Sequence, residues 1–326
     1  MTITSRPGAR RTGYQPSPGG GRATWRRPRR DRVVEALWGY AFIAPLGLGL
    51  AVFYLWPVLQ TAYFSFTAWG AFGGHSWSGL DNYRQLLHDH EFGQALVNTL
   101  AYTALGLVSI PLAIVFAALL DRPGLRGTGA YRTLFFLPVV TMPVAVAMVW
   151  RWLYNGDYGL VNYLLSLVGL KGPHWVSDPR VALFALVVVG VWSSIGYNLV
   201  IFLAGMQGIP KEYYEAAEID GAGPVRQFFS VTLPLLSPTA FFVSVISVIG
   251  SLQLFDLVYV MAGSGAAARS NPAFPRLETV VQLFYDRAFV TNDRGYAAAI
   301  VMVLLLIIVL LTAVQFRLQK RWVHYG

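Results

Sequence analysis

The stretch EYYEAAEIDGAGPVRQFFSVTLPLLSP, residues 212 to 238, lies between two long apolar segments and differs from both of them. Its first part has the composition of a short polar helix, which is interrupted at residues 221–223, Gly-Ala-Gly. Glycine reaches positive φ without steric cost, so we expect a sharp turn there. A simple connection between two apolar helices would need neither a formed helix nor this composition. The stretch therefore raises the question of what it contacts.

Apolar blocks dominate the rest of the chain. Of its 326 residues, 55% are hydrophobic, and a helix that crosses a bilayer core needs about 20 mostly apolar residues. Six segments meet this requirement, so we expect an all-α polytopic membrane protein with six transmembrane helices. The predicted spans are residues 38–66, 95–120, 133–154, 181–206, 236–262 and 296–318.

The distribution of positive charge predicts the orientation of these spans, because cytoplasmic loops carry an excess of Lys and Arg. We place the N-terminus in the cytoplasm, and six spans then return the C-terminus there. In this arrangement 17 of the 25 Lys and Arg residues are cytoplasmic. They lie in the N-terminal tail, in the connections 121–132 and 207–235, and at the C-terminal end. Nine of them are arginines of the tail, which therefore decides the orientation.

Residues 1–35 are predicted to be a disordered basic cytoplasmic tail, because they are rich in Arg, Gly and Pro and have no apolar periodicity. Such a tail could bind nucleic acid. Beside a membrane span it is more simply interpreted as a topology signal or a contact with anionic lipid. We therefore expect membrane lipids, and no nucleic acid, among the partners. Residues 36–326 are expected to form one six-span domain.

The connection 207–235 breaks the charge rule that orients the chain. It contains one Lys and one Arg against three Glu and one Asp, a net charge of −2. Anionic lipid would repel it, since helices that lie on such lipid are rich in Lys and Arg. Tyr213, Ala216 and Ala217 share one face of the predicted helix, and small residues beside one aromatic suit insertion into a groove of another protein. A helical hairpin that only reverses the chain would account for the turn but not for the charge, so we expect a cytoplasmic protein partner.

The same stretch resembles the Glu-Ala-Ala signature of the permease subunits of ATP-binding cassette (ABC) importers, in which Glu-Ala-Ala is followed by a nearby glycine and then by Leu-Pro. In that family the loop forms coupling helices that sit in a cleft of the cytoplasmic ATPase. The shared helix face makes Tyr213 a candidate ATPase-coupling residue, and the resemblance implies that the others are Glu215, Ala216, Ala217, Asp220, Gly221, Ala222, Leu233 and Pro234.

Shorter motifs extend the resemblance over nearly the whole chain after residue 36, towards carbohydrate-importer permeases of the maltose and glycerol-3-phosphate type. They include residues 54–57 (Tyr-Leu-Trp-Pro) and 79–83 (Gly-Leu-Asp-Asn-Tyr). The resemblance implies a type I ABC importer permease fold in the bacterial plasma membrane. It also implies a second homologous permease, an ATPase dimer and an external solute-binding lipoprotein as partners. ATP and Mg²⁺ would bind to the ATPase, because this chain has no phosphate-binding Gly-x-x-x-x-Gly-Lys-Ser/Thr motif. No cofactor and no catalytic residue are expected in it.

Polar side chains inside spans are costly and are therefore candidates for lining a substrate pathway. Sugars suit walls of aromatic, amide and hydroxyl groups, and in related maltose permeases the sugar contacts come from spans four and five. The alternative for each Ser and Asn is a hydrogen bond between helices, and the Asp could equally be structural. The candidates in these two spans are Ser194, Tyr197, Asn198, Ser251, Gln253 and Asp256.

Three other functions remain to be weighed against a neutral sugar permease. A glycerol-3-phosphate permease of the same family would need cations for the phosphate, and spans four and five contain no Lys or Arg. A secondary transporter would show related halves and broken helices, and it would give the acidic helix no role. A membrane enzyme would need paired carboxylates or histidines within spans. No metal site is expected: the chain has no cysteine, and residues 88–90, His-Asp-His, are more simply a solvated loop.

Overall fold

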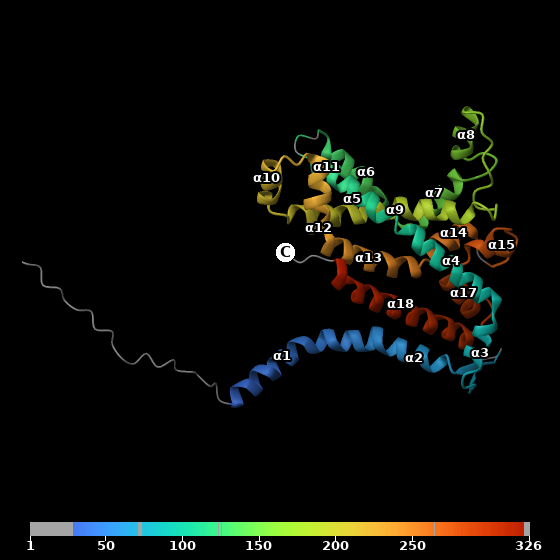
Figure 1. Cartoon of the computed structure of the whole chain (residues 1–326). Coiled ribbons are helices and arrows are strands. Elements are labelled where there is room, and N and C mark those ends of the chain that lie inside the picture. Colours follow the sequence, from blue (N-terminus) through green and yellow to red (C-terminus); the bar gives the residue numbers. More distant parts are fainter. Residues whose placement is uncertain (1–28, 71–73, 123, 125, 264, 323–326) are drawn as a thin grey trace, which may run out of the picture. The chain divides into compact units, whose positions relative to one another are not determined.

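The computed structural model describes residues 29–70, 74–122, 124, 126–263 and 265–322, and it is almost entirely helical (Figure 1). The chain divides between Pro57 and Val58 into two compact units, which are described separately. Four of the described helices are long and apolar enough to cross a membrane, and two bent helix pairs raise this number to six if each pair is one span. The predicted all-α membrane fold is therefore confirmed.

The first unit is a helix that continues into the second unit. α1 (Arg29–Leu50) is followed by a π-helical turn, η1 (Ala51–Leu55), and by α2 (Trp56–Phe64). The stretch Val34–Phe64 forms the first candidate span. Residues 29–35, which we predicted to be disordered, belong to α1, because arginine favours the helix and extends it beyond its apolar part. The rest of the predicted tail lies outside the described residues.

A small hairpin follows α2 and was not predicted. β1 (Thr67–Trp69) pairs antiparallel with β2 (His75–Trp77), so that Thr67 lies opposite Trp77. Asn82 in α3 (Asp81–His88) fixes the hairpin to the next helix, because its Nδ2 donates to the carbonyl oxygens of Ser65 and Thr67, both at 2.9 Å. The strands are too short for alternation of apolar and polar residues to reveal them.

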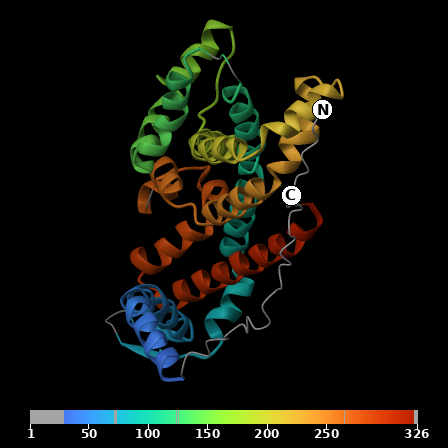
Figure 2. The ribbon, with the colours of Figure 1, turned by 90° about the vertical axis from the view of Figure 1, so that its left-hand side faces the viewer.

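Three predicted spans are found close to their expected positions. The second is α4 (His90–Gly106) followed by α5 (Ser109–Leu120), the fourth is α9 (Ala182–Gln207) and the sixth is α18 (Arg294–Trp322). Both views of the ribbon show α13, the helix of the fifth span, between α9 and α18, and it packs against both (Figures 1 and 2).

The third predicted span, 133–154, is wrong as a continuous helix. It consists of α6 (Thr128–Val140) and α7 (Pro143–Leu153), whose axes are bent by 102° at the break between them. Proline disfavours the helical conformation in the residue before it. Met142 accordingly has a ψ of 132°. The proline at position 143 therefore ends one helix and starts the next.

The fifth predicted span, 236–262, is also interrupted. α13 (Ser237–Leu252) ends before three non-helical residues, and the much shorter α14 (Asp256–Ala262) follows. Phe255 at the break has a φ of −131° and a ψ of −61°, outside the helical region. Three short helical pieces precede α13 and together are bent by 65° relative to it. They are α11 (Pro224–Gln227), the π-helical η2 (Phe228–Thr232) and α12 (Leu233–Leu235).

The remaining helices lie in the connections. α8 (Leu160–Leu167) precedes α9, and α10 (Lys211–Ile219) follows it. Four pieces connect α14 to α18 in chain order: α15 (Gly265–Arg269), α16 (Phe274–Leu277), α17 (Val280–Tyr285) and the π-helical η3 (Asp286–Val290).

α9 packs closely against its neighbours in the core. Leu199 and Phe202 of α9 are buried against Ala113 and Ala117 of α5. α6 and α9 approach each other closely because residue 196 is a glycine. A Cβ atom added at Gly196 would lie 1.9 Å from the carbonyl oxygen of Phe135. Backbone atoms cannot move away as easily as the end of a side chain, so this contact requires glycine.

Gly196→Ala is therefore expected to force α6 and α9 apart and to destabilise the fold by about 1–3 kcal/mol, the usual cost of overpacking. The measurement is the apparent melting temperature of the purified protein in detergent. Gly250→Ala in α13 is the matched control, because no described atom lies within 4 Å of a Cβ atom at Gly250. An equal melting temperature for the two variants would contradict the prediction.

Candidate functional site

The candidate coupling site is the connection between α9 and α13, which projects at the end of α9 opposite to α14 (Figure 1). α9 ends at Gln207, and Pro210 directly precedes α10. Proline suits this position because the first N–H groups of a helix have no partner within the helix. Glu212 in the first turn of α10 complements the positive end of the helix dipole. The sequence thus starts a separate helix immediately after the span.

The turn after α10 is a Schellman motif. Gly221 has a φ of +75°, and its N–H donates to the carbonyl oxygen of Glu218 at 3.0 Å. The N–H of Ala222 donates to the carbonyl oxygen of Ala217 at 2.9 Å, which completes the pair of bonds that defines this helix end. Gln227 braces the turn from the other side, because its Nε2 donates to the carbonyl oxygen of Ala222 at 2.9 Å. The predicted glycine turn is confirmed.

A side-chain hydrogen bond holds α10 against η2. The hydroxyl groups of Tyr214 and Thr232 lie 3.0 Å apart, and Thr232 is buried. Neither residue was among the predicted coupling residues. The sequence pattern selected Tyr213 because it shares a face with Ala216, whereas the structure turns the neighbouring tyrosine inward. Only the packing partner in η2 distinguishes the two tyrosines.

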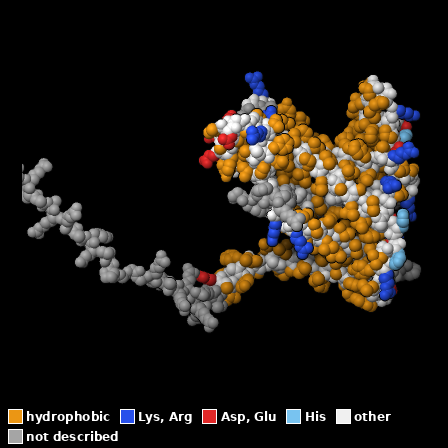
Figure 3. All heavy atoms as spheres, viewed as in Figure 1, with side chains coloured by type: hydrophobic (Ala, Val, Ile, Leu, Met, Phe, Trp, Pro, Cys, Tyr) orange, Lys and Arg blue, Asp and Glu red, His pale blue; other side chains and the backbone are white. Residues whose placement is uncertain are grey.

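Most of the predicted coupling residues are available to another protein. Tyr213, Glu215, Ala216, Asp220 and Gly221 are exposed, and Figure 3 shows acidic and hydrophobic side chains side by side around α10. Ile219, Val225 and Phe229, which the pattern did not select, extend the exposed apolar surface, with 87% of Ile219 accessible. Ala217 and Pro234 are half-buried, Leu233 is only just exposed, and Ala222 is buried inside the loop, where it can act only by shaping the turn.

Tyr214→Phe is expected to loosen α10 while leaving the membrane helices intact. A typical intramolecular hydrogen bond contributes about 0.5–1.5 kcal/mol, so local opening of α10 should become roughly two- to tenfold more frequent. Amide hydrogen exchange of α10 measures this change. Tyr213→Phe removes the same hydroxyl from a half-exposed ring and should leave exchange unchanged. Equal exchange in both variants would argue against the brace.

The structure separates the six predicted pathway residues into two groups. Asn198 is buried, and its Nδ2 donates to Oγ of Ser109 in α5 at 3.4 Å. Ser194 donates to the carbonyl oxygen of Val191 in its own helix at 3.0 Å. Ser251 is half-buried beside Gly106 of α4, whose Cβ position lies 3.7 Å from its Oγ. Of these three, only Asn198 makes the bond between helices that the alternative described, and Ser194 bonds within its own helix.

The other three pathway candidates face outward. Tyr197 on α9 is 45% accessible, and Gln253 and Asp256 are exposed at the break between α13 and α14. The break places the end of one helix and the start of another beside these polar side chains. A substrate could therefore bond to them without competition from a neighbouring helix of this chain.

An ionic cluster that the sequence analysis missed lies where α4, η3 and α18 begin. Asp89 caps α4, since its Oδ1 accepts from the N–H of Glu91 at 2.8 Å, and its Oδ2 accepts from the hydroxyl of Tyr296. Arg287 forms ion pairs with Glu91 and Asp89. Residues 88–90, interpreted as a solvated loop, are instead the end of α3, the cap of α4 and its first residue, and Asp89 belongs to an ion network. The acid that follows α16, Glu278, is buried beside this cluster.

Burial and then the neighbouring carboxylates of Glu91 and Asp286 raise the pKa of Glu278 to about 8, and Arg287 lowers this pKa by less than they raise it. Burial also raises the pKa of Asp286, whose Oδ1 accepts from Nε2 of Gln282 at 3.5 Å. At neutral pH the Glu278 carboxyl is therefore mostly protonated. No feature of the sequence around this glutamate distinguishes it from a solvated loop acid.

Known proteins are similar to this chain in sequence and in architecture. A family model described as "Binding-protein-dependent transport system inner membrane component" matches residues 109–324. The probable ABC transporter permease protein YesP of Bacillus subtilis is 37% identical over 304 residues, which cover 91% of this chain and 94% of that protein. The sn-glycerol-3-phosphate transport system permease protein UgpA of Agrobacterium fabrum is 34% identical over 292 residues, which cover 88% of this chain and 96% of that protein.

The fold comparison agrees with these relatives. A chain of a bacterial ABC transporter involved in the import of the acidic polysaccharide alginate superposes with a TM-score of 0.77, over 90% of this chain and 98% of that chain. The two sequences are 21% identical, so this likeness concerns the fold alone. The overall architecture of this chain is therefore found in a solved structure.

Proposed function

We propose that this chain, which belongs to the family of binding-protein-dependent transport system inner membrane components, couples import of a sugar to ATP hydrolysis by a separate polypeptide. The family membership makes it a multi-pass permease subunit of an ABC importer. A secondary transporter is thereby ruled out. The proposal goes further than family membership in three respects: the coupling partner, the orientation in the membrane and the substrate.

One observation carries the coupling proposal: α10 is a preformed, exposed acidic helix that is braced to its own loop. The bond between Tyr214 and Thr232 and the Schellman turn fix its position, so a push on α10 is transmitted to α13 without first unfolding the loop. The ATPase would bind ATP and Mg²⁺, and this chain would bind neither. Each transport step is then a shift between two states that the ATPase contacts differently.

The orientation proposal follows from charge. The loop 207–235 and both termini are placed in the cytoplasm, because the Arg-rich tail favours that side. The loops on the other side would then meet an external solute-binding protein, in keeping with the family description. A second homologous permease and an ATPase dimer complete the proposed assembly. A transporter of similar fold has been solved in complex with an alginate pentasaccharide-bound periplasmic protein.

The proposed substrate is a neutral sugar that contacts Tyr197, Gln253 and Asp256. These side chains are exposed, and α9, α13 and α14 contain no Lys or Arg that would neutralise a phosphate. Glycerol-3-phosphate is the second candidate, because relatives such as UgpA are named for its transport. One cation approaches this wall: Nη1 of Arg151 donates to the carbonyl oxygen of Val260 in α14 at 3.1 Å.

The experiment is ATP-driven uptake into vesicles that contain this chain together with its partner ATPase, second permease and binding protein. Uptake of a radiolabelled neutral sugar, lost when the ATPase cannot hydrolyse ATP, would support the proposal. Uptake of sn-glycerol-3-phosphate that depends on Arg151 would favour the second candidate. Uptake that persists without any ATPase would overturn the coupling.

A further inference from the structure

The apolar face of α8 points away from the protein. Leu160, Tyr163, Leu164, Leu167 and Val168 follow one another at the spacing i, i+3, i+4, i+7 and i+8, which places them on one face of the helix. This is the stripe that a helix of a water-soluble protein buries. Here all five side chains are exposed, and between 44% and 71% of each is accessible.

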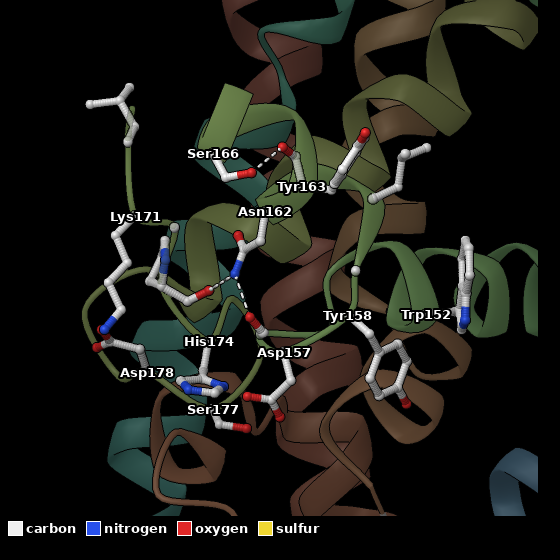
Figure 4. Close-up of a pocket in the computed structure, with 16 residues that line it drawn as sticks. Trp152, Asp157, Tyr158, Asn162, Tyr163, Ser166, Lys171, His174, Ser177 and Asp178 are labelled. Atoms are coloured by element: carbon white, nitrogen blue, oxygen red, sulfur yellow. Dashed lines mark hydrogen bonds between the residues drawn. The ribbon is translucent and has the colours of Figure 1, made fainter. Parts of the chain in front are cut away.

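The opposite side of α8 is fixed to its own connection, so the stripe cannot simply rotate inward. Nδ2 of Asn162 donates to the carbonyl oxygens of Gly156 at 2.9 Å and Pro173 at 3.1 Å, and its Oδ1 accepts from Nε1 of Trp175 at 2.7 Å. Figure 4 shows Asn162 pointing into the cleft, with its bonds to both sides of the connection. A Cβ atom at Gly172 would lie 1.9 Å from Oδ1 of Asn162, so the contact is tight.

Charge is absent from the stripe and gathered on the other side of the cleft. Residues 158–170 contain no charged side chain. Asp157, Lys171 and Asp178 line the cleft behind α8, which has a volume of about 1000 Å³ (Figure 4). Figure 3 shows the same division in the lobe that α8 forms: hydrophobic side chains cover the side that faces along the spans towards α10, and Lys and Arg lie along the opposite edge.

We infer that α8 lies in the outer interface of the bilayer, with this stripe in contact with lipid. The apolar side faces in the direction in which the spans run, where the hydrocarbon core is, and the charged edge faces away from it. Exposed apolar surface costs about 25 cal/mol per Å² in water, which favours lipid as the occupant. Trp152, Tyr158 and Tyr163 lie in or beside the helix, and such aromatic side chains are enriched at membrane interfaces.

A transient docking protein, such as the proposed external solute-binding protein, fits these observations less well. Protein interfaces of this kind have polar rims, and a partner that leaves during each transport cycle would return the whole charge-free stripe to water. Lipid is continuously present and needs no polar rim on the stripe. The inference concerns only the membrane contact of α8 and does not depend on which solute is transported.

The test uses the full chain, which has no cysteine, so that single labels can be attached without other substitutions. Leu164→Cys places a fluorescent label on the stripe, and Ser177→Cys places the same label in the cleft on the exposed Ser177. Both proteins are reconstituted into vesicles of phosphatidylethanolamine and phosphatidylglycerol. We expect lipids brominated on their acyl chains to quench the Leu164 label several-fold more than the Ser177 label, and iodide on both sides of the membrane to show the opposite order.

Equal quenching of the two labels by iodide would overturn the inference, because the stripe would then be in water. Protection of the Leu164 label from both quenchers would overturn it as well, since protein would cover the stripe. Val168→Cys provides a second position on the same stripe if Leu164→Cys does not insert. Its label must behave like that of Leu164 for the inference to hold.

Discussion

Gly221→Trp is expected to insert and fold normally but to lower ATP-driven uptake by about tenfold or more. Among the described residues outside the turn itself no atom lies within 4 Å of a Cβ atom at Gly221, so a side chain can begin there without a clash. A non-glycine residue at a φ of +75° adds strain of about 1–2 kcal/mol. The large effect would come from the ATPase, whose contact with the turn the ring would block, since losing about 1.4 kcal/mol of binding lowers affinity tenfold.

Gly221→Asn separates strain from bulk. Asparagine tolerates positive φ better than other residues with a side chain, and its amide is much smaller than an indole. We therefore expect uptake close to that of the native chain. A loss of uptake as large as in Gly221→Trp would show that the turn geometry, rather than the space beside it, is what matters. Normal uptake by the tryptophan variant would contradict the proposed contact.

Charge reversal tests the same surface by an independent route. Glu215→Lys changes an exposed residue of α10 and is expected to reduce both co-purification of the ATPase and ATP-driven uptake. Asp157→Lys makes the same charge change on an exposed residue of the outer connection, away from α10, and should leave co-purification of the ATPase unchanged. If both variants retained the ATPase equally well, the acidic character of α10 would have no role in docking.

The membrane spans were predictable because apolar blocks of this length rarely occur outside membrane helices, and four of the six correspond to the expected helices. The breaks in the other two depend on local competition that composition does not reveal. Pro143 was visible in the sequence, but prolines are tolerated inside spans when neighbouring helices satisfy the freed carbonyls. The break at residues 253–255 contains neither proline nor glycine, so no local signal marks it.

The candidate site shows the same limit at the level of single residues. The order Glu-Ala-Ala, glycine and Leu-Pro identified the loop and its turn, because each depends on the local backbone. The choice between Tyr213 and Tyr214 depends on Thr232, which lies 18 residues further along the chain than Tyr214. Glu278 became notable only when the fold brought Glu91 close to it from 187 residues earlier in the sequence.

Glu278→Gln is expected to stabilise the protein at neutral and alkaline pH and to remove part of its pH dependence. The carboxyl group is buried. The carboxylates of Asp89 and Glu91 from the start of α4 and of Asp286 from η3 oppose its ionisation, and Arg287 is the one cation of the described residues that favours it. Glutamine has nearly the same shape as a protonated glutamic acid and cannot ionise. The variant therefore keeps the form that the native site prefers.

The sign follows from proton binding. The folded-state pKa of Glu278 is about 8, above its ordinary value of 4.5, so between these values the folded protein binds one proton more than the unfolded chain. The free energy of unfolding then falls as the pH rises. One pKa unit corresponds to about 1.4 kcal/mol. The difference between variant and native protein should grow from about 1 kcal/mol at about pH 5 towards an upper bound of about 5 kcal/mol above pH 8.

Apparent melting temperatures in detergent at several values between about pH 5 and pH 9 measure this difference. Glu212→Gln removes a carboxyl from the exposed first turn of α10, and its melting curve should run parallel to that of the native protein. Gly196→Ala should lower the melting temperature by the same amount at every pH, because its effect is steric. A melting temperature of Glu278→Gln that falls with pH as steeply as that of the native chain would mean that Glu278 is already ionised in the folded state, and that the carboxylates around it are compensated by Arg287.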